Sequence, residues 1–203
     1  MSIPALSNSR LLFRVDPLPH ESPRGYLCRV AHAHGYSGPV SLAQIAGLSA
    51  SSLERDDGVK QISHVLRLEP EEWLAMCYRH IKGRGRFDQR SFCGERVNAD
   101  DLNYGGPRLC PACLRKQPVW WAIWDLGLVT ACPIHRCLLL NECPACTRKL
   151  VWQRPAVHKC RCDLDFRTAN PKPATRDLVV INAAIYRAAR FSAGETVEYD
   201  LAH

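Results

Sequence analysis

Eight side chains between residues 110 and 162 lie in four close pairs whose types and spacing are those of zinc ligands. In three of the pairs two residues separate the ligands, so a tight turn can point both at one ion, and a proline after the first ligand favours that turn. Seven thiols and one imidazole are enough for two tetrahedral sites, one with three thiolates and the imidazole and the other with four thiolates. The pairs are Cys110 and Cys113, Cys132 and His135, Cys143 and Cys146, and Cys160 and Cys162.

The four pairs can be shared between two zinc ions per chain in two ways. A sequential arrangement joins the first pair with the second and the third with the fourth, whereas a cross-brace joins the first with the third and the second with the fourth. Both use four protein ligands for each ion and leave no place for a reactive water, so the sites are predicted to be structural and not catalytic. Cys137 could replace a neighbouring ligand, and Cys93 is a spare thiol. Disulfides, or cysteines buried by chance, are the competing interpretation.

Composition narrows the class of protein. With 203 residues, of which 46% are hydrophobic, the chain suits one globular domain or two small ones. Eleven cysteines without a secretory signal favour a reducing cytoplasm, where thiols bind metal instead of forming disulfides. The lack of a run of about 18 apolar residues argues against a membrane span. The 27 Lys and Arg against 20 Asp and Glu leave a net charge of +7, a modest bias toward polyanions or acidic partners.

The elements that must position the ligand pairs begin with an arm and a cluster of helices. Residues 1–21 are expected to form an extended arm, because their prolines exclude a continuous helix. Over residues 22–82 a helix-turn-helix-like helical cluster is predicted, beginning with a helix for which Ser22 is the expected N-cap. Two further helices are expected from near Asp57 and from Pro70.

Residues 41–57 carry the helix-turn-helix pattern. A short helix capped by Ser41 is followed by a turn at Gly47 and by a second short helix, and small side chains let two such helices cross closely. A plain helical corner is the structural alternative, and a true helix-turn-helix can also hold protein or RNA in place of DNA. On the functional interpretation, the nucleic-acid contacts of this segment are Ser49, Ser51, Ser52 and Arg55.

The next segments are predicted to be a basic linker and a zinc module. Residues 83–109 are rich in Gly, Lys and Arg and are interpreted as a loop, either a polyanion-binding segment or a solvated connection. Residues 110–166 are predicted to form a tandem zinc-finger module with small β ribbons, in which three closely spaced tryptophans form the core. The ribbon's predicted nucleic-acid contacts are Arg148, Lys149 and Arg161.

A C-terminal helix is predicted over residues 175–192. Its apolar stripe needs a cover, either the body of the molecule or part of a longer protein. The helical cluster and the zinc module are expected to pack as one body, with Trp73 and Trp124 in a shared core. The predicted fold class is therefore mainly α with small β zinc ribbons. The residues of the C-terminal stripe are Leu178, Ile181, Ile185 and Ala188.

No catalytic residue is predicted, and the chain is expected not to be an enzyme. The sequence offers no nucleophile beside a base, no acidic metal triad and no glycine loop that would cradle phosphates. A RING-type ligase is the enzymatic alternative, because the first ligand pairs and Cys137 begin like a RING. The five residues between Cys137 and Cys143 are more than a RING needs before its next ligand.

Two stretches resemble the TniQ family. DPLPHESPRGYLCRVAHAHGY, at 16–36, is similar to the opening of TniQ proteins, in which a Pro-rich arm and a Glu-Ser lead into a helix ending in Arg-x-Ala and a glycine. CPACLRKQPVWWAIWDLGLVTACPIHRCLLLNECPAC, at 110–146, is similar to the family's order of CPxC, a Trp helix, CPxH, a leucine run and a second CPxC. Cys160-x-Cys162 completes the pattern, and the resemblance covers roughly residues 16–166.

The resemblance implies a target-selection adaptor in DNA transposition. TniQ-like proteins link a target-recognition module, in some systems an RNA-guided CRISPR effector complex, to the AAA+ ATPase TnsC, which recruits the transposase. TnsD-like members read a DNA attachment site themselves but carry long C-terminal extensions, so a chain of this length is expected to depend on a partner. A stand-alone zinc-containing helix-turn-helix protein that reads an attachment site is the alternative.

Both functions imply a bacterial protein of the cytoplasm that is associated with the nucleoid, has nucleic acid as a partner and has no membrane partner. Both are compatible with an oligomer. The contact with the ATPase is expected on the arm and the first helices, because an extended segment beside a helix cluster suits docking onto a partner. An arm that packs only on its own domain is the alternative. The expected charge partners of the ATPase are Arg10, Arg14, Arg24 and Arg29.

Overall fold

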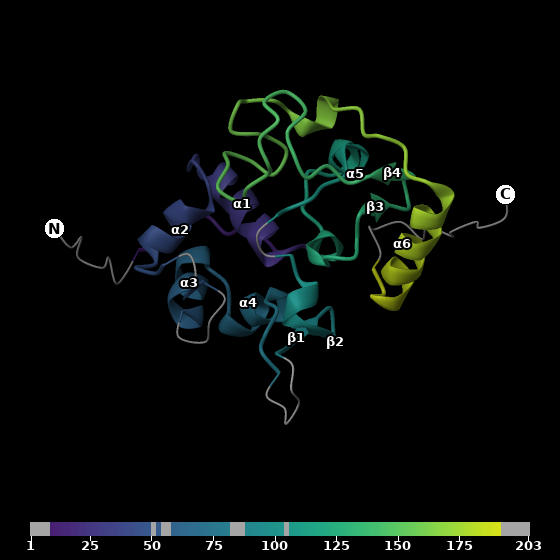
Figure 1. Ribbon diagram of the computed structural model, residues 1–203. Helices are drawn as coiled ribbons and strands as arrows, with labels where there is room; N and C mark the ends of the chain where they lie inside the picture. The colour runs from purple at the N-terminus through teal and green to yellow at the C-terminus, as the bar shows by residue number, and fades with distance from the viewer. Residues whose placement is uncertain (1–8, 50–51, 54–57, 82–87, 104–105, 192–203) are drawn as a thin grey trace.

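A computed structural model describes residues 9–49, 52–53, 58–81, 88–103 and 106–191 (Figure 1). Figure 1 shows helices α1 to α4 gathered on one side, the loops that follow β4 lying above α1 and α5, and α6 on the other side. The N-terminal elements are α1 (Pro23–Ala33), α2 (Pro39–Ile45), α3 (Val59–Leu66), α4 (Pro70–Met76), β1 (Gln89–Phe92), β2 (Glu95–Asn98) and the 3₁₀ helix η2 (Ala99–Asp101). The C-terminal elements are α5 (Pro111–Lys116), η3 (Ala122–Asp125), β3 (Ala131–Cys132), β4 (Cys137–Leu138), η4 (Phe166–Thr168) and α6 (Arg176–Ala188).

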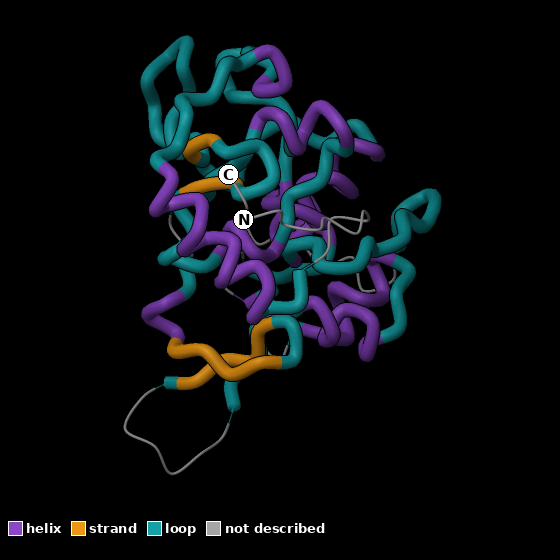
Figure 2. The backbone as a smooth tube through the Cα atoms, turned by 90° about the vertical axis from the view of Figure 1, so that its right-hand side faces the viewer, coloured by secondary structure: helices purple, strands orange, loops and turns teal. Residues whose placement is uncertain are grey.

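The described chain mixes helices with small sheets, so the mainly helical prediction is right in part. Figure 2 shows the two antiparallel hairpins, β1–β2 and β3–β4, well apart in the molecule. The ribbon expected after the third ligand pair is reduced to isolated bridges, such as the pairing of Ala156 with Lys159. Within the described residues, no helix is both long and apolar enough to cross a bilayer.

Helix α1 begins where the sequence predicts, but Ser22 has a different role from the one expected. Pro23 occupies the first turn, where its missing N–H costs nothing. Ser22 stands at the N-cap position without a side-chain capping bond. Its hydroxyl instead donates to the carboxylate of Asp125 at 2.6 Å, so the residue joins two distant segments rather than ending a helix.

The helix-turn-helix arrangement is not confirmed. Helix α2 begins at Pro39, ahead of the expected cap Ser41, and ends before Gly47, whose φ of +67° supplies the expected turn. The second helix was expected over residues that include 50–51 and 54–57, which lie outside the described chain. The next described helix is α3, which packs on both α2 and α4.

The basic segment 83–109 contains a hairpin that the sequence analysis interpreted as a loop. In this hairpin β1 and β2 pair in antiparallel register, with Phe92 opposite Glu95. Its two-residue loop, Cys93-Gly94, has positive φ at both positions, +49° and +86°. This is the backbone of a type I′ turn, which Asn-Gly signals far more strongly than Cys-Gly does.

Two apolar clusters form the core, and α1 contributes to both. Tyr26 and Leu27 pack with Trp73 in the helical cluster, whereas Cys28 packs with Trp124 in the cluster around the ligand pairs. The prediction that Trp73 and Trp124 share a core is therefore wrong. Each tryptophan anchors its own cluster, and α1 is the element common to both.

The contact of α1 with the Trp120–Asp125 segment is close. A Cβ added to Gly25 would lie 2.4 Å from the Cβ of Trp120, so only glycine lets the two backbones approach this far. The Ser22 N–H donates to the carbonyl of Trp120 at 2.8 Å. Tyr78 donates a second hydroxyl bond, 2.7 Å long, to Asp125, which is 4% exposed. The junction therefore combines tight packing with a hydrogen-bonded buried carboxylate.

The predicted apolar stripe of α6 is wrong in part. Ile181 is 55% exposed, and the buried side chains of the helix are Asn182, Ala183 and Tyr186. The amide oxygen of Asn182 accepts from the backbone N–H groups that lead into β3, and the Tyr186 hydroxyl accepts from the indole of Trp124 at 3.0 Å. Polar groups with fixed partners thus decide which face of α6 is turned inward.

We predict that Gly25→Ala destabilises the protein by about 1–3 kcal/mol, because the added methyl group would overlap Trp120. At an open helical position the same change would stabilise the protein by about 0.5–1 kcal/mol. The sign of the change in stability therefore tells whether α1 lies against Trp120. The measurement is the urea midpoint of the variant and of the wild type at equal metal content. An unchanged or higher midpoint would show that α1 does not lie against Trp120.

Candidate metal centres

The first cluster of ligand atoms is assembled by α5 and by the β3–β4 turn. Cys110 is the N-cap residue of α5, and its sulfur accepts from the Cys113 N–H one turn later. Cys132 ends β3, and His135 lies in the turn that leads to β4. The four ligand atoms lie within 4.8 Å of one another. The local turns therefore position each pair, and the two pairs meet where Cys113 contacts Cys132 and His135.

The distances in this cluster fit a tetrahedral zinc ion. Bonds of about 2.3 Å to sulfur and about 2.05 Å to nitrogen, at tetrahedral angles, place two sulfurs about 3.8 Å apart and a sulfur about 3.6 Å from a nitrogen. The sulfurs of Cys113 and Cys132 are 3.6 Å apart. Nδ1 of His135 lies 3.3 to 3.6 Å from the sulfurs of Cys110, Cys113 and Cys132. His135 would thus bind an ion through Nδ1.

A fifth thiol, Cys137, borders the first cluster. Its sulfur lies 3.6 Å from that of Cys110, and in the β3–β4 ladder it is paired with Cys132. Neighbouring sulfurs, Cys113 first among them, lower the pKa of Cys110 and so favour the thiolate that binds metal. The set of four ligands that gathers within 4.8 Å is nevertheless complete without Cys137.

The second cluster joins the third and fourth ligand pairs. The sulfurs of Cys143 and Cys162 are 3.6 Å apart, and those of Cys146 and Cys160 are 3.8 Å apart, both close to the tetrahedral separation. Arg148 Nε donates to the sulfur of Cys146 at 3.5 Å and lowers the pKa of that thiol to about 6. The two clusters follow the sequential arrangement of the pairs and not the cross-brace.

A left-handed residue directly follows the second ligand in three of the four pairs. These residues are Arg136, Thr147 and Asp163, with φ values of +49°, +56° and +66°. The left-handed residue turns the chain back over the ligand pair, and the N–H of Thr147 donates to the carbonyl of Cys143 at 2.8 Å. Such a conformation is costly for a β-branched residue like threonine. The surrounding geometry therefore has to impose it.

The residues expected to contact nucleic acid fall into two separate groups. Arg148, Lys149 and Arg161 line one pocket beside the second cluster. Ser49 and Ser52 follow α2 and have hydroxyl oxygens 2.8 Å apart. The other two candidates of that segment, Ser51 and Arg55, lie outside the described residues.

Arg154 is the functional candidate that the sequence analysis missed. An arginine among the basic residues of the ribbon is expected at the surface, but Arg154 is only 2% exposed. Its guanidinium carbon lies 4.2 Å from the ring centre of Trp120, a cation–π geometry. Burial lowers the pKa of its guanidinium. The sole local signal was the tryptophan two residues earlier, Trp152, whose ring centre lies 5.6 Å away.

Three of the arginines expected to face an ATPase have partners within the chain. Arg14 forms an ion pair with Glu72 at 2.7 Å, which lowers the pKa of that carboxyl. Arg29 pairs at 2.6 Å with Glu21, whose side chain is fully buried; burial raises the pKa of Glu21 and Arg29 counteracts that rise. Arg10 Nε lies 3.3 Å from His64.

Arg24, the fourth of these arginines, lies over the Trp152 ring at 6.0 Å. The arm is also fixed to the helices, because the Leu11 N–H donates to the carbonyl of Val65 and the Leu11 side chain is 3% exposed. The described part of the arm is thus anchored to its own chain through Leu11 and through its paired arginines.

Comparison with known proteins identifies one family. A family model described as TniQ matches residues 12–139, which is more than half of the chain and includes the first ligand cluster. No curated protein matches the chain.

We predict two zinc ions in the wild type and the loss of one in Cys113→Ser or in Cys146→Ser. A structural zinc site contributes about 10–16 kcal/mol, comparable with the whole stability of a domain at about 5–15 kcal/mol, so each change should also unfold the surrounding loops. Elemental analysis and circular dichroism provide the two readouts. Cys93→Ser is the matched control, since that thiol is exposed on the β1–β2 turn and should leave both zinc ions in place.

We further predict that Cys137→Ala keeps two zinc ions, because the four-ligand cluster beside it is already complete. The buried sulfur packs against Cys110, so a modest loss of stability is expected from the missing atom alone. A variant with a single zinc ion would instead make Cys137 a ligand.

Proposed function

Because the chain belongs to the TniQ family of transposition proteins, we propose that it is a target-selection adaptor that links a target-recognition complex to a TnsC-like AAA+ ATPase. In this role the chain makes contacts and turns over no substrate of its own. The recognition complex is either an RNA-guided CRISPR effector complex or protein bound at a DNA attachment site. The family match is the observation that carries the proposal.

The proposal assigns one structural zinc ion to each ligand cluster. The support is the agreement of the sulfur and nitrogen separations with tetrahedral geometry. Four protein ligands for each ion leave no place for an activated water, so the ions would serve to fix the loops that carry the basic residues. Arg148, next to Cys146, is one such residue.

The proposal places the ATPase contact on an apolar strip of the arm. Leu12 is 87% exposed and Phe13 is 48% exposed, although the residue before them is firmly buried. Phe13 stacks on His34 with ring centres 4.1 Å apart, and the ring of Tyr36 lies nearly parallel to the same imidazole with ring centres 6.4 Å apart. Contiguous exposed apolar and aromatic side chains on a rigid support are typical of protein contacts. The paired arginines of the arm would then hold this strip in place.

The proposal places the target-side contact on the basic residues of the zinc loops. Arg148, Lys149 and Arg161 are exposed beside the second cluster. Phosphate contacts from such side chains give affinity without sequence specificity, which suits an adaptor whose partner selects the target.

We predict that the double change Leu12→Ser and Phe13→Ser lowers co-purification with the TnsC-like ATPase by about tenfold or more, since truncated apolar hot spots commonly cost over 1.4 kcal/mol each. Deleting the whole arm would be a poor test, because Leu11 and Glu21 belong to the folded core. Leu128→Ser is the matched control, because Leu128 is 69% exposed in the loop before β3. Undiminished recruitment by the folded, zinc-loaded double variant would place the ATPase contact elsewhere.

A further inference from the structure

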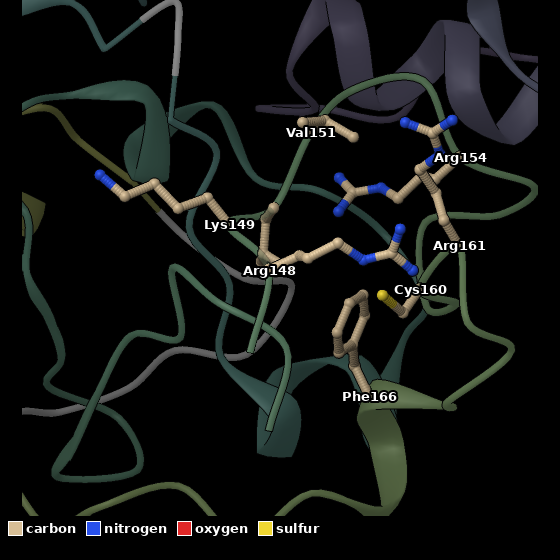
Figure 3. Close-up of a pocket in the computed structure, with 8 residues that line it drawn as sticks. Arg148, Lys149, Val151, Arg154, Cys160, Arg161 and Phe166 are labelled. Carbon is tan, nitrogen blue, oxygen red and sulfur yellow. The ribbon is translucent and has the colours of Figure 1, made fainter. Parts of the chain in front are cut away.

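A small basic pocket lies beside the second ligand cluster. It has a volume of about 100 Å³, and its polar lining is dominated by Arg148, Lys149, Arg154 and Arg161. Figure 3 shows Arg148, Arg154 and Arg161 grouped with the sulfur of Cys160 and the ring of Phe166, whereas the Lys149 side chain extends away from this group. No acidic side chain of the described residues lines it. The pocket therefore concentrates positive charge in a confined volume.

The decisive feature of the pocket is the buried guanidinium of Arg154. Among the described residues, none hydrogen-bonds its Nε, Nη1 or Nη2, although all three atoms are buried. The ring of Trp120 covers one face of the group at 4.2 Å. Burial lowers the pKa of its guanidinium, and the neighbouring Cys28 sulfur opposes that shift most, ahead of Cys160 and Asp125. A buried cation with free N–H groups requires a further partner.

We propose that this pocket binds a phosphate group of a nucleic-acid backbone, with Arg154 as the buried donor and Arg148, Lys149 and Arg161 at the rim. This inference rests on the proposed function, because it names the chemistry of the target-side contact. A guanidinium offers a planar fork of N–H groups that matches two oxygens of a phosphate. The pocket volume accommodates a tetrahedral oxyanion, and a small movement of a rim side chain would let that ion reach the buried nitrogens of Arg154.

The neighbouring ligand cluster does not remove this preference for an anion. A zinc ion held by four thiolates carries a net charge of about −2. Arg148 donates to Cys146 and so neutralises part of that charge. The three guanidinium groups gathered at the pocket still leave an excess of positive charge after the cluster is counted. Water molecules alone would satisfy the N–H groups of Arg154, but they would leave that excess uncompensated.

The first test uses inorganic phosphate as the probe on the full chain with both zinc ions loaded. We expect phosphate to raise the melting temperature above the value in chloride at equal ionic strength, and to broaden its ³¹P resonance. Both effects should be lost in Arg154→Lys, which keeps the charge but not the fork, and in the rim variant Arg161→Ala. Arg176→Ala, at the exposed start of α6, is the matched control and should keep both effects.

The second test measures binding of a short DNA duplex and of a single-stranded RNA of equal length across a salt series. We expect Arg154→Lys and Arg161→Ala to weaken binding of at least one of the two about ten- to a hundredfold, and Arg161→Ala to lower the salt slope by about one, as for one lost phosphate contact. Zinc content and circular dichroism show whether Arg154→Lys, a change at a buried residue, still folds. If it does not, Arg161→Ala, at the exposed rim, decides the test.

Two results would overturn the proposal. Phosphate that stabilises the wild type no better than chloride would mean that the pocket holds only water. Phosphate binding with unchanged nucleic-acid affinity in Arg161→Ala would mean that the pocket takes a free anion or an acidic protein segment. Failure of the adaptor role is a separate outcome, because it would appear as lost ATPase recruitment while phosphate binding to the pocket persists.

Discussion

The contact between α1 and the Trp120–Asp125 segment is the constraint on which the rest of the structure depends. It needs a glycine at position 25, because the helix lies directly against Trp120, and it needs the buried carboxylate of Asp125, which accepts from Ser22 and Tyr78. The segment lies between the first two ligand pairs, so the two apolar clusters and the first metal cluster share one junction. Directional hydrogen bonds to a buried charge set the angle of α1 more strictly than apolar packing could.

The two ligand clusters lie within an apolar cluster in the region where the elements are shortest. Strands β3 and β4 have two residues each, so few ladder hydrogen bonds hold the loops around them. Ligand pairs and left-handed residues provide the local order instead. The same loops carry the basic side chains, with Arg148 bonded to Cys146 and Arg161 between the ligands Cys160 and Cys162. The geometry of the basic surface therefore depends on what the clusters hold.

Local signals in the sequence predicted the ligand pairs and the starts of α1 and α4, because tight turns and prolines act over a few residues. Features that depend on distant partners could not be read in this way. Ser22 looks like a cap until Asp125 is placed beside it, and Arg154 looks like a surface cation until tryptophans cover it. On α6, helical periodicity assigned Ile181 to the buried face, whereas Asn182 lies there because backbone N–H groups need its oxygen. The hydrogen bonds that buried polar groups need therefore decided which face of α6 is buried, and the positions of its apolar side chains did not.

The position of α1 in the chain has a consequence for the order in which the molecule is built. Ser22 and Asp125 are 103 residues apart, and Cys28 lies 126 residues before Arg154, whose carbonyl accepts from its thiol. At roughly 5–20 residues per second, a ribosome takes about 5–25 s to make the intervening chain. During that interval the Cys28 face of α1 lacks its contacts with the Trp120–Asp125 segment and with Arg154. Closure of this junction must wait until Trp120–Asp125 and Arg154 have been made, and until then the Cys28 face of nascent α1 is open to chaperones and proteases.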